Sequence, residues 1–355
     1  MDRQRRRIAV IGAGAWGTTL ANLLAENEDE VLLWVFEEDL LRALVEKREN
    51  IFFLPGVRLA ESLRFTHSLE EALAERETVV CAVPSHAVRE VFLRARAHLS
   101  RGALLISVTK GLEDGTHLPM SRVLQEVIGP GREVQIAALS GPSFAGEVSR
   151  RIPTAVAAAG TTSRAGQEAQ ALFSRPYFRV YTNPDVLGVE LGGAIKNVLA
   201  IATGASDGMG FGHSSRAALI TRGLAEMTRL GASLGAQRQT FFGLAGMGDL
   251  VLTCTGDLSR NRRVGLELGR GKTLKEILEG MRMVAEGVRT AKALWELAQK
   301  QRVDMPISEE VYQILYQGKN PREAVQGLMS RLPRSEQEDP PAESPSSYLK
   351  RDDLF

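Results

Sequence analysis

Cysteine and histidine are scarce in this sequence of 355 residues. The only cysteines are Cys81 and Cys254, and the five histidines are scattered without the spacing of a metal site. Two cysteines in apolar surroundings are not typical of a disulfide framework and fit a reducing compartment better. We therefore predict a cytoplasmic protein that binds no metal.

A large net charge and a long apolar run are also missing. The chain has 44 basic and 43 acidic side chains, so no overall field attracts nucleic acid or anionic lipid. No uninterrupted apolar stretch approaches the roughly 20 residues that span a bilayer. The apolar run after the basic segment Met1 to Arg7 covers only Ile8 to Ile11, which is too short for a signal peptide. We expect no nucleic-acid partner and no membrane span, and the first arginines are more simply a solvated lead-in than a nucleic-acid arm.

The pattern of the remaining residues predicts two folded domains and a tail. Short β-branched runs alternate with helical patterns over residues 1–185, which predicts an α/β domain with a Rossmann-type, doubly wound parallel sheet. Residues 186–332 are rich in Ala, Leu and Gly at helical spacing and predict an all-α domain. Residues 333–355 are rich in Pro, Ser, Glu and Asp, which predicts a disordered tail. The strands expected are Arg7–Ile11, Val31–Phe36, Thr78–Val83, Leu104–Val108 and Glu133–Ala137, with Thr154–Ala158 and Phe178–Tyr181 at the far edge of the sheet.

A glycine-rich string follows the first expected strand. Residues Gly12-Ala13-Gly14-Ala15-Trp16-Gly17 fit G-x-G-x-x-G between a strand and a helix, the context that makes this motif informative. The first glycine permits a tight turn, the second removes a side chain that would block a pyrophosphate, and the third lets helix and strand pack closely. The unpaired N–H groups of the helix then face the phosphates. The alternative is a glycine-rich turn without a ligand.

The second expected strand ends in Phe36, followed by the acids Glu37 to Asp39. An acidic side chain there can accept hydrogen bonds from the adenosine ribose and would repel a 2′-phosphate, so NAD is favoured over NADP. Phe36 is either a core residue or a contact for adenine. A second phosphate-loop candidate, Gly269 to Thr273, does not fit the P-loop template because residue 266 is Leu.

Lys196 is the only cation in the apolar, small-residue helical pattern from Gly188 to Ala202. An unpaired ammonium buried there would cost several kcal/mol, so it must reach a cavity, a partner or a ligand. Burial also lowers the pKa of a lysine and makes it a better base near neutral pH. The alternative is a structural ion pair, for instance with Glu190.

Other polar residues could complete a site around this lysine. Lys110 follows the strand ending at Val108, at the edge where open α/β sheets bind ligands. The turn around Ser143 offers N–H groups and a hydroxyl, although turn chemistry alone explains it equally well. Asp249 could be a carboxylate partner, and Arg260 with Asn261 offers donors suited to a phosphate monoester. A run of arginines is, however, often only a solvated helix face.

Taken together, these strings resemble the NAD(P)-dependent sn-glycerol-3-phosphate dehydrogenases in their bacterial form, over residues 7–330. The resemblance implies interconversion of glycerol 3-phosphate and dihydroxyacetone phosphate for phospholipid synthesis, by a cytosolic homodimer. The motifs that carry it are Gly12 to Thr18, Ser140-Gly141-Pro142-Ser143-Phe144-Ala145, Gly192-Gly193-Ala194-Ile195-Lys196-Asn197-Val198, Ala245-Gly246-Met247-Gly248-Asp249-Leu250, Thr253-Cys254 and Ser259-Arg260-Asn261-Arg262.

The resemblance also implies roles for individual residues. Lys196 is the proton-transfer residue, with Lys110 and Asp249 as its catalytic neighbours. The substrate-binding residues that it implies are Lys110, Gly141, Ser143, Asn197, Asp249, Thr253, Ser259, Arg260 and Asn261. The cofactor-binding residues are Gly12, Gly14, Ala15, Trp16, Gly17, Phe36, Lys110, Ala145, Arg260, Val284 and Glu286.

The sequence departs from the family at one position and leaves two other functions open. Many bacterial members carry a basic residue where this chain has Phe36, whereas the run from Trp34 to Asp39 looks like the NAD-using eukaryotic enzymes. A related dehydrogenase of another hydroxy acid or sugar would not need Arg260 and Asn261. A catalytically silent nucleotide sensor would not need Lys196.

Overall fold

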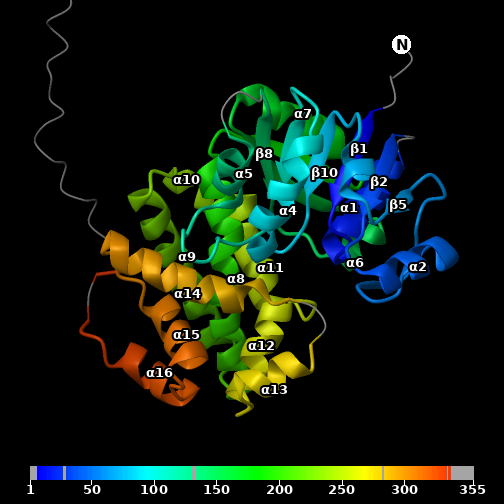
Figure 1. Ribbon diagram of the computed structural model, residues 1–355. Helices are drawn as coiled ribbons and strands as arrows, with labels where there is room; N and C mark the ends of the chain where they lie inside the picture. Colours follow the sequence, from blue (N-terminus) through cyan, green and yellow to red (C-terminus); the bar gives the residue numbers. More distant parts are fainter. Residues whose placement is uncertain (1–5, 27–28, 130–132, 282–283, 334, 337–355) are drawn as a thin grey trace, which may run out of the picture.

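The alternating apolar runs of the N-terminal half form one eight-stranded sheet (Figure 1). The structure is a computed structural model that describes residues 6–26, 29–129, 133–281, 284–333 and 335–336. The strands of the sheet are β1 (Arg7–Ile11), β2 (Glu30–Trp34), β5 (Arg64–Thr66), β6 (Thr78–Cys81), β7 (Leu104–Ser107), β8 (Gln135–Ser140), β9 (Thr154–Gly160) and β10 (Phe178–Asn183). Their order is β10-β9-β8-β7-β6-β1-β2-β5, so the chain winds outward from β1 in both directions.

All of the predicted strands are present, and the sheet contains features that were not predicted. Neighbouring strands are parallel except β8 and β9, which are antiparallel. The edge strand β5 was missed because its three residues form no apolar run. A small hairpin of β3 (Glu49–Asn50) and β4 (Leu54–Arg58) was missed for the same reason. The predicted doubly wound architecture is nevertheless confirmed.

Alternate residues of a strand point to opposite faces of the sheet, and helices cover both faces. Ile8 and Val10 of β1 join one apolar core with α1, α2 and α7, whereas Ala9 and Ile11 join another with α3, α4 and α5. The helical elements of this half are α1 (Ala15–Ala25), α2 (Glu38–Lys47), α3 (Leu69–Leu73), η1 (Ser85–Ala87), α4 (Val88–Ala95), η2 (Arg96–His98), α5 (Met120–Ile128), α6 (Ala145–Ser149) and α7 (Ser163–Phe173).

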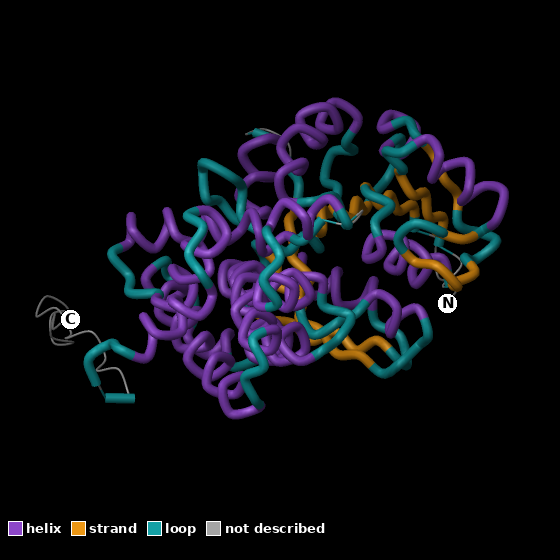
Figure 2. Tube along the Cα trace, turned by 90° about the horizontal axis from the view of Figure 1, so that it is seen from below, coloured by secondary structure: helices purple, strands orange, loops and turns teal. Residues whose placement is uncertain are grey.

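The described residues of the C-terminal half form helices joined by loops and no strand, as the sequence predicts (Figure 2). Its long central helix packs against most of the others and supplies much of their shared core. The helices are α8 (Val186–Gly208), α9 (His213–Ser233), α10 (Arg238–Phe241), η3 (Leu244–Gly248), α11 (Asp249–Thr255), α12 (Arg260–Gly269), α13 (Leu274–Glu279), α14 (Glu286–Gln301), α15 (Pro306–Tyr316) and α16 (Pro321–Met329). Most of the predicted tail, residues 333–355, lies outside the described residues. The domain boundary at residue 185 stays a prediction.

Glycines let α8 and α12 pack with their backbones in contact. A Cβ atom on Gly204 would lie 2.0 Å from the carbonyl oxygen of Arg262, and one on Gly265 would lie 2.0 Å from that of Ile201. No larger residue fits either position without moving a helix. This close packing brings the N-terminal end of α12 to the middle of α8.

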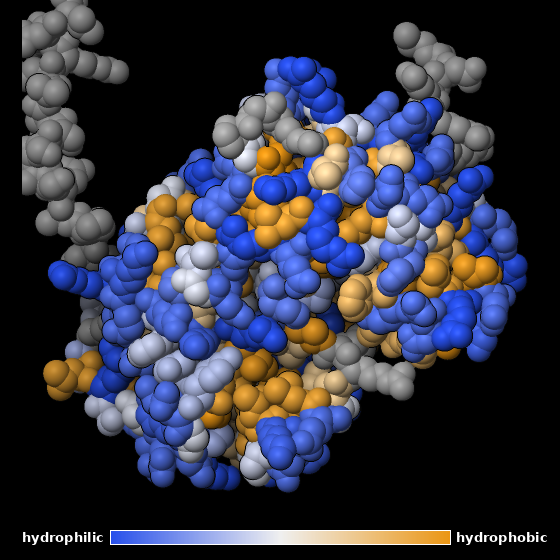
Figure 3. All heavy atoms as spheres, in the orientation of Figure 1, coloured by the Kyte–Doolittle hydropathy of each residue, from blue (hydrophilic) through white to orange (hydrophobic). Residues whose placement is uncertain are grey.

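Helix α8 is long and apolar enough to cross a membrane by length and composition, although Glu190 and Lys196 interrupt its apolar residues. Of the residues in its most apolar stretch, 83% are buried inside the protein, as in the core helix of a folded domain. The face of the molecule in Figure 3 is mainly hydrophilic, with apolar residues in small patches between.

Candidate active site

The glycine-rich turn between β1 and α1 has the geometry that the motif predicts. Gly12 adopts φ = 115°, and a Cβ atom there would lie 2.8 Å from the Ala82 carbonyl. A Cβ on Gly17 would lie 2.0 Å from the Gly12 oxygen, whereas one on Gly14 would meet nothing within 4 Å. The space in front of the N-terminus of α1 is therefore open. The N-cap residue is Gly14, and no side chain caps the helix. Its N–H groups are available to an anion, as a bound pyrophosphate requires.

The buried indole Nε1 of Trp16, one residue into α1, has no hydrogen-bond partner among the described residues. A buried donor of this kind costs free energy unless a ligand or water satisfies it. Helix α6, which follows the turn after β8, packs against α1, where the Thr19 hydroxyl lies 3.4 Å from the Ala145 carbonyl oxygen. The glycine-rich turn, the indole of Trp16 and the nearby Ala145 together fit a bound dinucleotide.

The end of β2 offers an exposed aromatic ring and exposed acids. The side chain of Phe36 is 62% exposed, which decides against the alternative that it is a core residue. Glu37, Glu38 and Asp39 are exposed directly after it. These positions lie at the carboxyl edge of the sheet, beside the glycine-rich turn, where the adenosine half of a dinucleotide binds in doubly wound folds.

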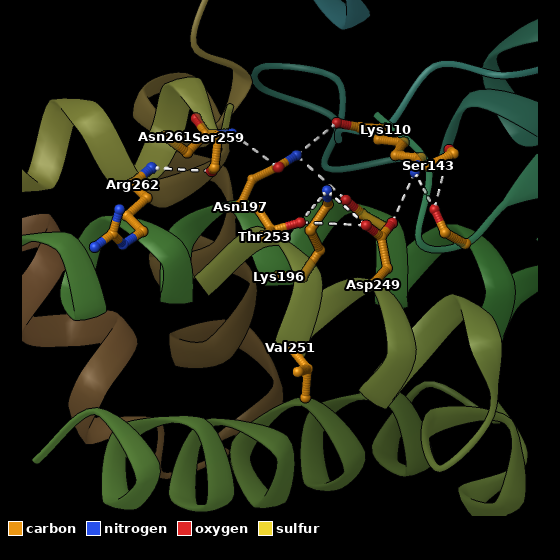
Figure 4. Close-up of polar contacts among 12 residues, drawn as sticks. Lys110, Ser143, Lys196, Asn197, Asp249, Val251, Thr253, Ser259, Asn261 and Arg262 are labelled. Carbon is orange, nitrogen blue, oxygen red and sulfur yellow. Dashed lines mark hydrogen bonds and ion pairs between the residues drawn. The ribbon is translucent and has the colours of Figure 1, made fainter. Parts of the chain in front are cut away.

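Two lysines from the two halves of the chain converge on one buried carboxylate (Figure 4). The Nζ of Lys196, on α8, lies 2.9 Å from Oδ1 of Asp249, and the Nζ of Lys110, in the loop after β7, lies 2.7 Å from Oδ2. Lys196 also donates to the Thr253 hydroxyl at 2.7 Å, and Lys110 donates to the Gly141 carbonyl at 2.9 Å. Asp249 is 1% exposed and Lys196 is 7% exposed. The alternative pairing of Lys196 with Glu190 is wrong, because Glu190 accepts hydrogen bonds from Ser121.

Burial lowers the pKa of Lys196 to about 8, because the ammonium form loses its hydration. The charge of Lys110 acts in the same direction, and Asp249 opposes both. Burial alone would raise the pKa of Asp249, but the ammonium groups of Lys110 and Lys196 hold it below its usual range. Asp249 is thus ionised at neutral pH, while Lys196 exchanges its proton close to neutrality.

Two asparagines link this group to α12 and α14. The Asn197 amide donates to the carbonyl oxygens of Lys110 and Gly193 at 3.2 Å, and its Oδ1 accepts from Asn261 at 2.8 Å. Oδ1 of Asn261 accepts from the backbone N–H of Gly287 at 2.9 Å. Both asparagines are buried, and the structure brings both to the site.

The N-terminal end of α12 carries the other residues expected to bind phosphate. The Ser259 hydroxyl caps the helix by accepting from the backbone N–H of Arg262 at 3.2 Å. Arg260 is exposed and donates to the carbonyl oxygen of Val284 at 3.0 Å. Arg262 instead pairs with Asp207 at 2.8 Å, so it serves the packing of α12 on α8. Only Arg260 of these two arginines is placed to reach a ligand.

The turn after β8 positions Gly141 and Ser143 beside Lys110. Gly141 adopts φ = 146°, and a Cβ there would lie 2.9 Å from the Val156 backbone, so no larger residue fits. The Ser143 hydroxyl donates to the Gly141 carbonyl at 3.2 Å (Figure 4). The same carbonyl accepts from Lys110, and the turn thereby holds that lysine toward Asp249.

A carboxylate of α14 connects to the N-terminal half through a residue that sequence reasoning missed. Glu286 accepts from the backbone N–H of Ser85 at 3.0 Å and from its hydroxyl at 2.5 Å. Ser85 follows β6 at the carboxyl edge of the sheet, and that position is the only sequence signal that could have singled it out. The described residues contain no group of three or more His, Cys, Asp or Glu side chains that could hold a metal ion.

Two family models together match most of the chain. The model of the NAD-dependent glycerol-3-phosphate dehydrogenase N-terminus matches residues 7–165, and that of the C-terminus matches residues 185–326. A relative from Geobacter sp. (strain M21), named glycerol-3-phosphate dehydrogenase (NAD(P)+), is 56% identical over 93% of this chain and 98% of its own length. A relative of the same name from Koribacter versatilis is 51% identical over 92% of this chain and 97% of its own.

Solved structures agree with these sequence comparisons. The crystal structure of glycerol-3-phosphate dehydrogenase from Coxiella burnetii superposes with a TM-score of 0.88 at 41% identity, over 92% of this chain and 99% of that one. The yeast enzyme from Saccharomyces cerevisiae gives a TM-score of 0.77 at 29% identity, over 91% of this chain and 99% of that one. The likeness therefore spans both halves of the molecule.

Proposed function

Because the chain belongs to the NAD-dependent glycerol-3-phosphate dehydrogenase family, we propose that it interconverts sn-glycerol 3-phosphate and dihydroxyacetone phosphate. The observation that carries the proposal is the buried group of Lys196, Asp249 and Lys110 at the junction of the two halves. This group lies at the carboxyl edge of a sheet whose glycine-rich turn fits a dinucleotide. A nicotinamide held there would accept or supply the hydride.

Lys196 moves the hydroxyl proton of the substrate. As a neutral amine it accepts the proton from the C2 hydroxyl while the C2 hydrogen leaves as hydride. In the reducing direction its ammonium form donates the proton to the new hydroxyl oxygen. A pKa of about 8 makes both forms accessible near neutral pH, as a general acid and base requires.

Asp249, Thr253 and Lys110 position this amine and set its charge. Asp249 and Thr253 hold the Lys196 Nζ from one side of the site. Lys110, which is anchored on Gly141, supplies a second positive charge for the substrate oxygen as negative charge develops on it. Gly141, Ser143 and Asn197 border the same space and complete the substrate site.

Arg260 binds the phosphate of the substrate, with Ser259 and Asn261 beside it at the start of α12. A guanidinium offers forked donors to a phosphate monoester, and the helix N-terminus adds N–H groups that favour an anion. Binding energy from the remote phosphate then holds C2 at the reacting position. The close packing of α8 against α12 fixes the distance between Arg260 and Lys196.

The cofactor site consists of the turn from Gly12 to Gly17, Phe36 and Lys110, together with Ala145, Arg260, Val284 and Glu286. The exposed acids after Phe36 repel a 2′-phosphate, so NAD is the preferred cofactor and NADP the weaker one. The two alternative functions are less well supported. A dehydrogenase of an unphosphorylated acid or sugar has no use for Arg260, and a silent nucleotide sensor has no use for Lys196 beside Asp249.

In the cell, this activity would supply glycerol 3-phosphate for phospholipid synthesis. We propose a cytoplasmic homodimer without a membrane span. The buried position of α8 supports the last point.

The rate of each direction should depend on the protonation of Lys196. Reduction needs the ammonium form, so kcat/KM for dihydroxyacetone phosphate should fall as pH rises through about 8. Oxidation needs the amine, so kcat/KM for glycerol 3-phosphate should rise through the same range. Because kcat/KM reports the free enzyme, steady-state rates between pH 6.5 and 9.5 measure this group directly.

Two variants should displace that profile in opposite directions. Asp249→Asn removes the charge that raises the pKa of Lys196, so the change in rate should occur at lower pH. Lys110→Met removes a charge that lowers the pKa of Lys196, so the change in rate should occur at higher pH. If both variants moved the pH dependence of kcat/KM in the same direction, this dependence could not be assigned to Lys196.

Oxidation of NADH by the purified protein tests the proposed function. We expect turnover with dihydroxyacetone phosphate and almost none with dihydroxyacetone, which lacks the phosphate. Equal use of both would favour the related dehydrogenase. Tight NADH binding without turnover of either would favour the silent sensor.

A further inference from the structure

A carboxylate at the start of α14 reaches the loop after β6, and the proposed proton transfer does not use this contact. Glu286 is the first residue of α14, in the helical half, whereas Ser85 is the first residue of η1, in the sheet half. Oε1 of Glu286 lies 3.0 Å from the backbone nitrogen of Ser85, and Oε2 lies 2.5 Å from its hydroxyl oxygen. One buried serine thus donates a hydrogen bond to each oxygen of the carboxylate.

Ser85 lies where doubly wound sheets bind their ligands. Strand β1 pairs with β2 on one side and with β6 on the other, so the strand order reverses between β1 and β6. Ligands bind in the crevice outside the carboxyl ends of the strands at such a reversal. The glycine-rich turn follows β1 at this crevice, and Ser85 lies in the loop that follows β6. The hydrogen bonds from Ser85 therefore fix the Glu286 carboxylate at the same crevice.

A glycine beside the two side chains keeps this contact close to the catalytic group. A Cβ atom on Gly111 would lie 2.7 Å from the Cβ of Ser85 and 3.1 Å from Oε2 of Glu286. No larger residue fits there without moving the serine. Gly111 directly follows Lys110, so the contact between Ser85 and Glu286 lies next to a lysine of the candidate site.

The first turn of α14 is held to its own half by different residues. Arg260 donates to the carbonyl oxygen of Val284 at 3.0 Å, and the backbone N–H of Gly287 donates to Asn261 at 2.9 Å. Arg260 and Asn261 both belong to α12. These bonds fix the turn on the helical half, and the hydrogen bonds from Ser85 connect it to the sheet half.

The strand order also indicates which part of a dinucleotide meets the carboxylate. In doubly wound folds the adenosine half binds at the strand in the position of β2, and the pyrophosphate binds at the glycine-rich turn. The nicotinamide half therefore extends over β6, on the opposite side of β1 from β2. A carboxylate accepts hydrogen bonds from hydroxyl groups and repels a phosphate, so Glu286 suits the ribose of this half.

We propose that Ser85 is a positioning residue for the cofactor, because it holds the Glu286 carboxylate where the hydroxyl groups of the nicotinamide ribose donate to it. The proposal rests on the dinucleotide site of the proposed function. Each carboxylate oxygen has two lone pairs, so a hydrogen bond from Ser85 leaves one free for the ribose. A carboxylate that is already oriented loses less freedom when the cofactor binds, which increases the affinity.

Dissociation constants of NADH, measured by fluorescence titration without substrate, test the proposal. Ser85→Ala removes the hydroxyl donor and keeps the backbone N–H. We expect it to raise the Kd of NADH about tenfold, which is at the low end for a hydrogen bond to a charged group. In steady-state rates, the loss should appear in KM for NADH and not in kcat, since Ser85 acts on the cofactor site.

A double-mutant cycle separates positioning of Glu286 from a general effect on the fold. Glu286→Ala should itself raise the Kd of NADH at least tenfold. In the Glu286→Ala background, Ser85→Ala should change the Kd by less than about twofold, because no carboxylate is left to hold. If Ser85 served only the fold, the effects of the two substitutions on Kd would multiply.

Ser100→Ala is the matched control, because Ser100 precedes β7 at the amino edge of the same sheet, opposite the crevice. Its Kd for NADH should equal that of the wild type. An unchanged Kd in Ser85→Ala, or a tenfold effect that persists in the Glu286→Ala background, would overturn the proposal. Absence of turnover with NADH and dihydroxyacetone phosphate would count against the proposed function alone, because the Kd values are measured without catalysis.

Discussion

Replacement of Lys196 by methionine should lower kcat in both directions by about a thousandfold, since general acid–base catalysis contributes about 10²- to 10⁴-fold. Methionine fills the same volume without an amine, so no void is left in the core of α8. Asp249 keeps its ion pair with Lys110, which limits the cost to folding. Steady-state oxidation of NADH with dihydroxyacetone phosphate measures the loss.

Lys292→Met is the matched control, because Lys292 is exposed on α14 and its ion pair with Glu296 is long, at 4.0 Å. Its kcat should equal that of the wild type. Thermal unfolding of the Lys196 variant should show a folded protein, and its Kd for NADH should be within about threefold of the wild-type value, since Lys196 acts on the substrate. A Lys196→Met protein with near-normal turnover would remove this residue from the proton-transfer step.

Replacement of Arg260 by alanine should lower kcat/KM for dihydroxyacetone phosphate by roughly ten- to two-hundredfold. A hydrogen bond to a charged group contributes about 1.5–3 kcal/mol, which corresponds to roughly ten- to two-hundredfold. Part of the loss should appear in kcat, because the phosphate holds C2 against the reacting groups. Rates with dihydroxyacetone, which has no phosphate, should fall much less, by the part that Arg260 contributes to binding the cofactor.

Arg263→Ala provides the comparison, since Arg263 is exposed on the same helix one residue beyond Arg262. It should leave both substrates unaffected. If Arg260→Ala reduced the rates with dihydroxyacetone and its phosphate to the same extent, Arg260 would serve the cofactor or the fold instead of the phosphate.

Much of the architecture could be predicted because the physical signals are local. Apolar runs of strand length identified β1, β6 and β7, and the glycine spacing identified the turn before α1. The edge strand β5 gave no such signal, since an edge strand with a polar face needs no apolar run. The antiparallel pairing of β8 and β9 depends on how the chain returns around α6, which periodicity does not encode.

The sequence signal for the candidate site was strongest where burial and charge conflict within one segment. Lys196 was singled out because a lone cation in an apolar helix demands a partner, and that partner is Asp249. The link from Asn197 to Asn261 could not be predicted from spacing, because it depends on the backbone contact between α8 and α12. The pair of Ser85 and Glu286 joins residues about two hundred positions apart, and only the folded chain brings them together.

The titration of the Lys196 amine tests the central claim most directly. Magnetic resonance of the protein with isotope-labelled lysine, assigned by comparison with Lys196→Met, follows this one group as pH changes. We expect a midpoint near 8, because burial and Lys110 together outweigh Asp249. A midpoint at the ordinary value of a solvated lysine, about 10.4, would show an amine that cannot exchange its proton near neutral pH and would contradict the proposed mechanism.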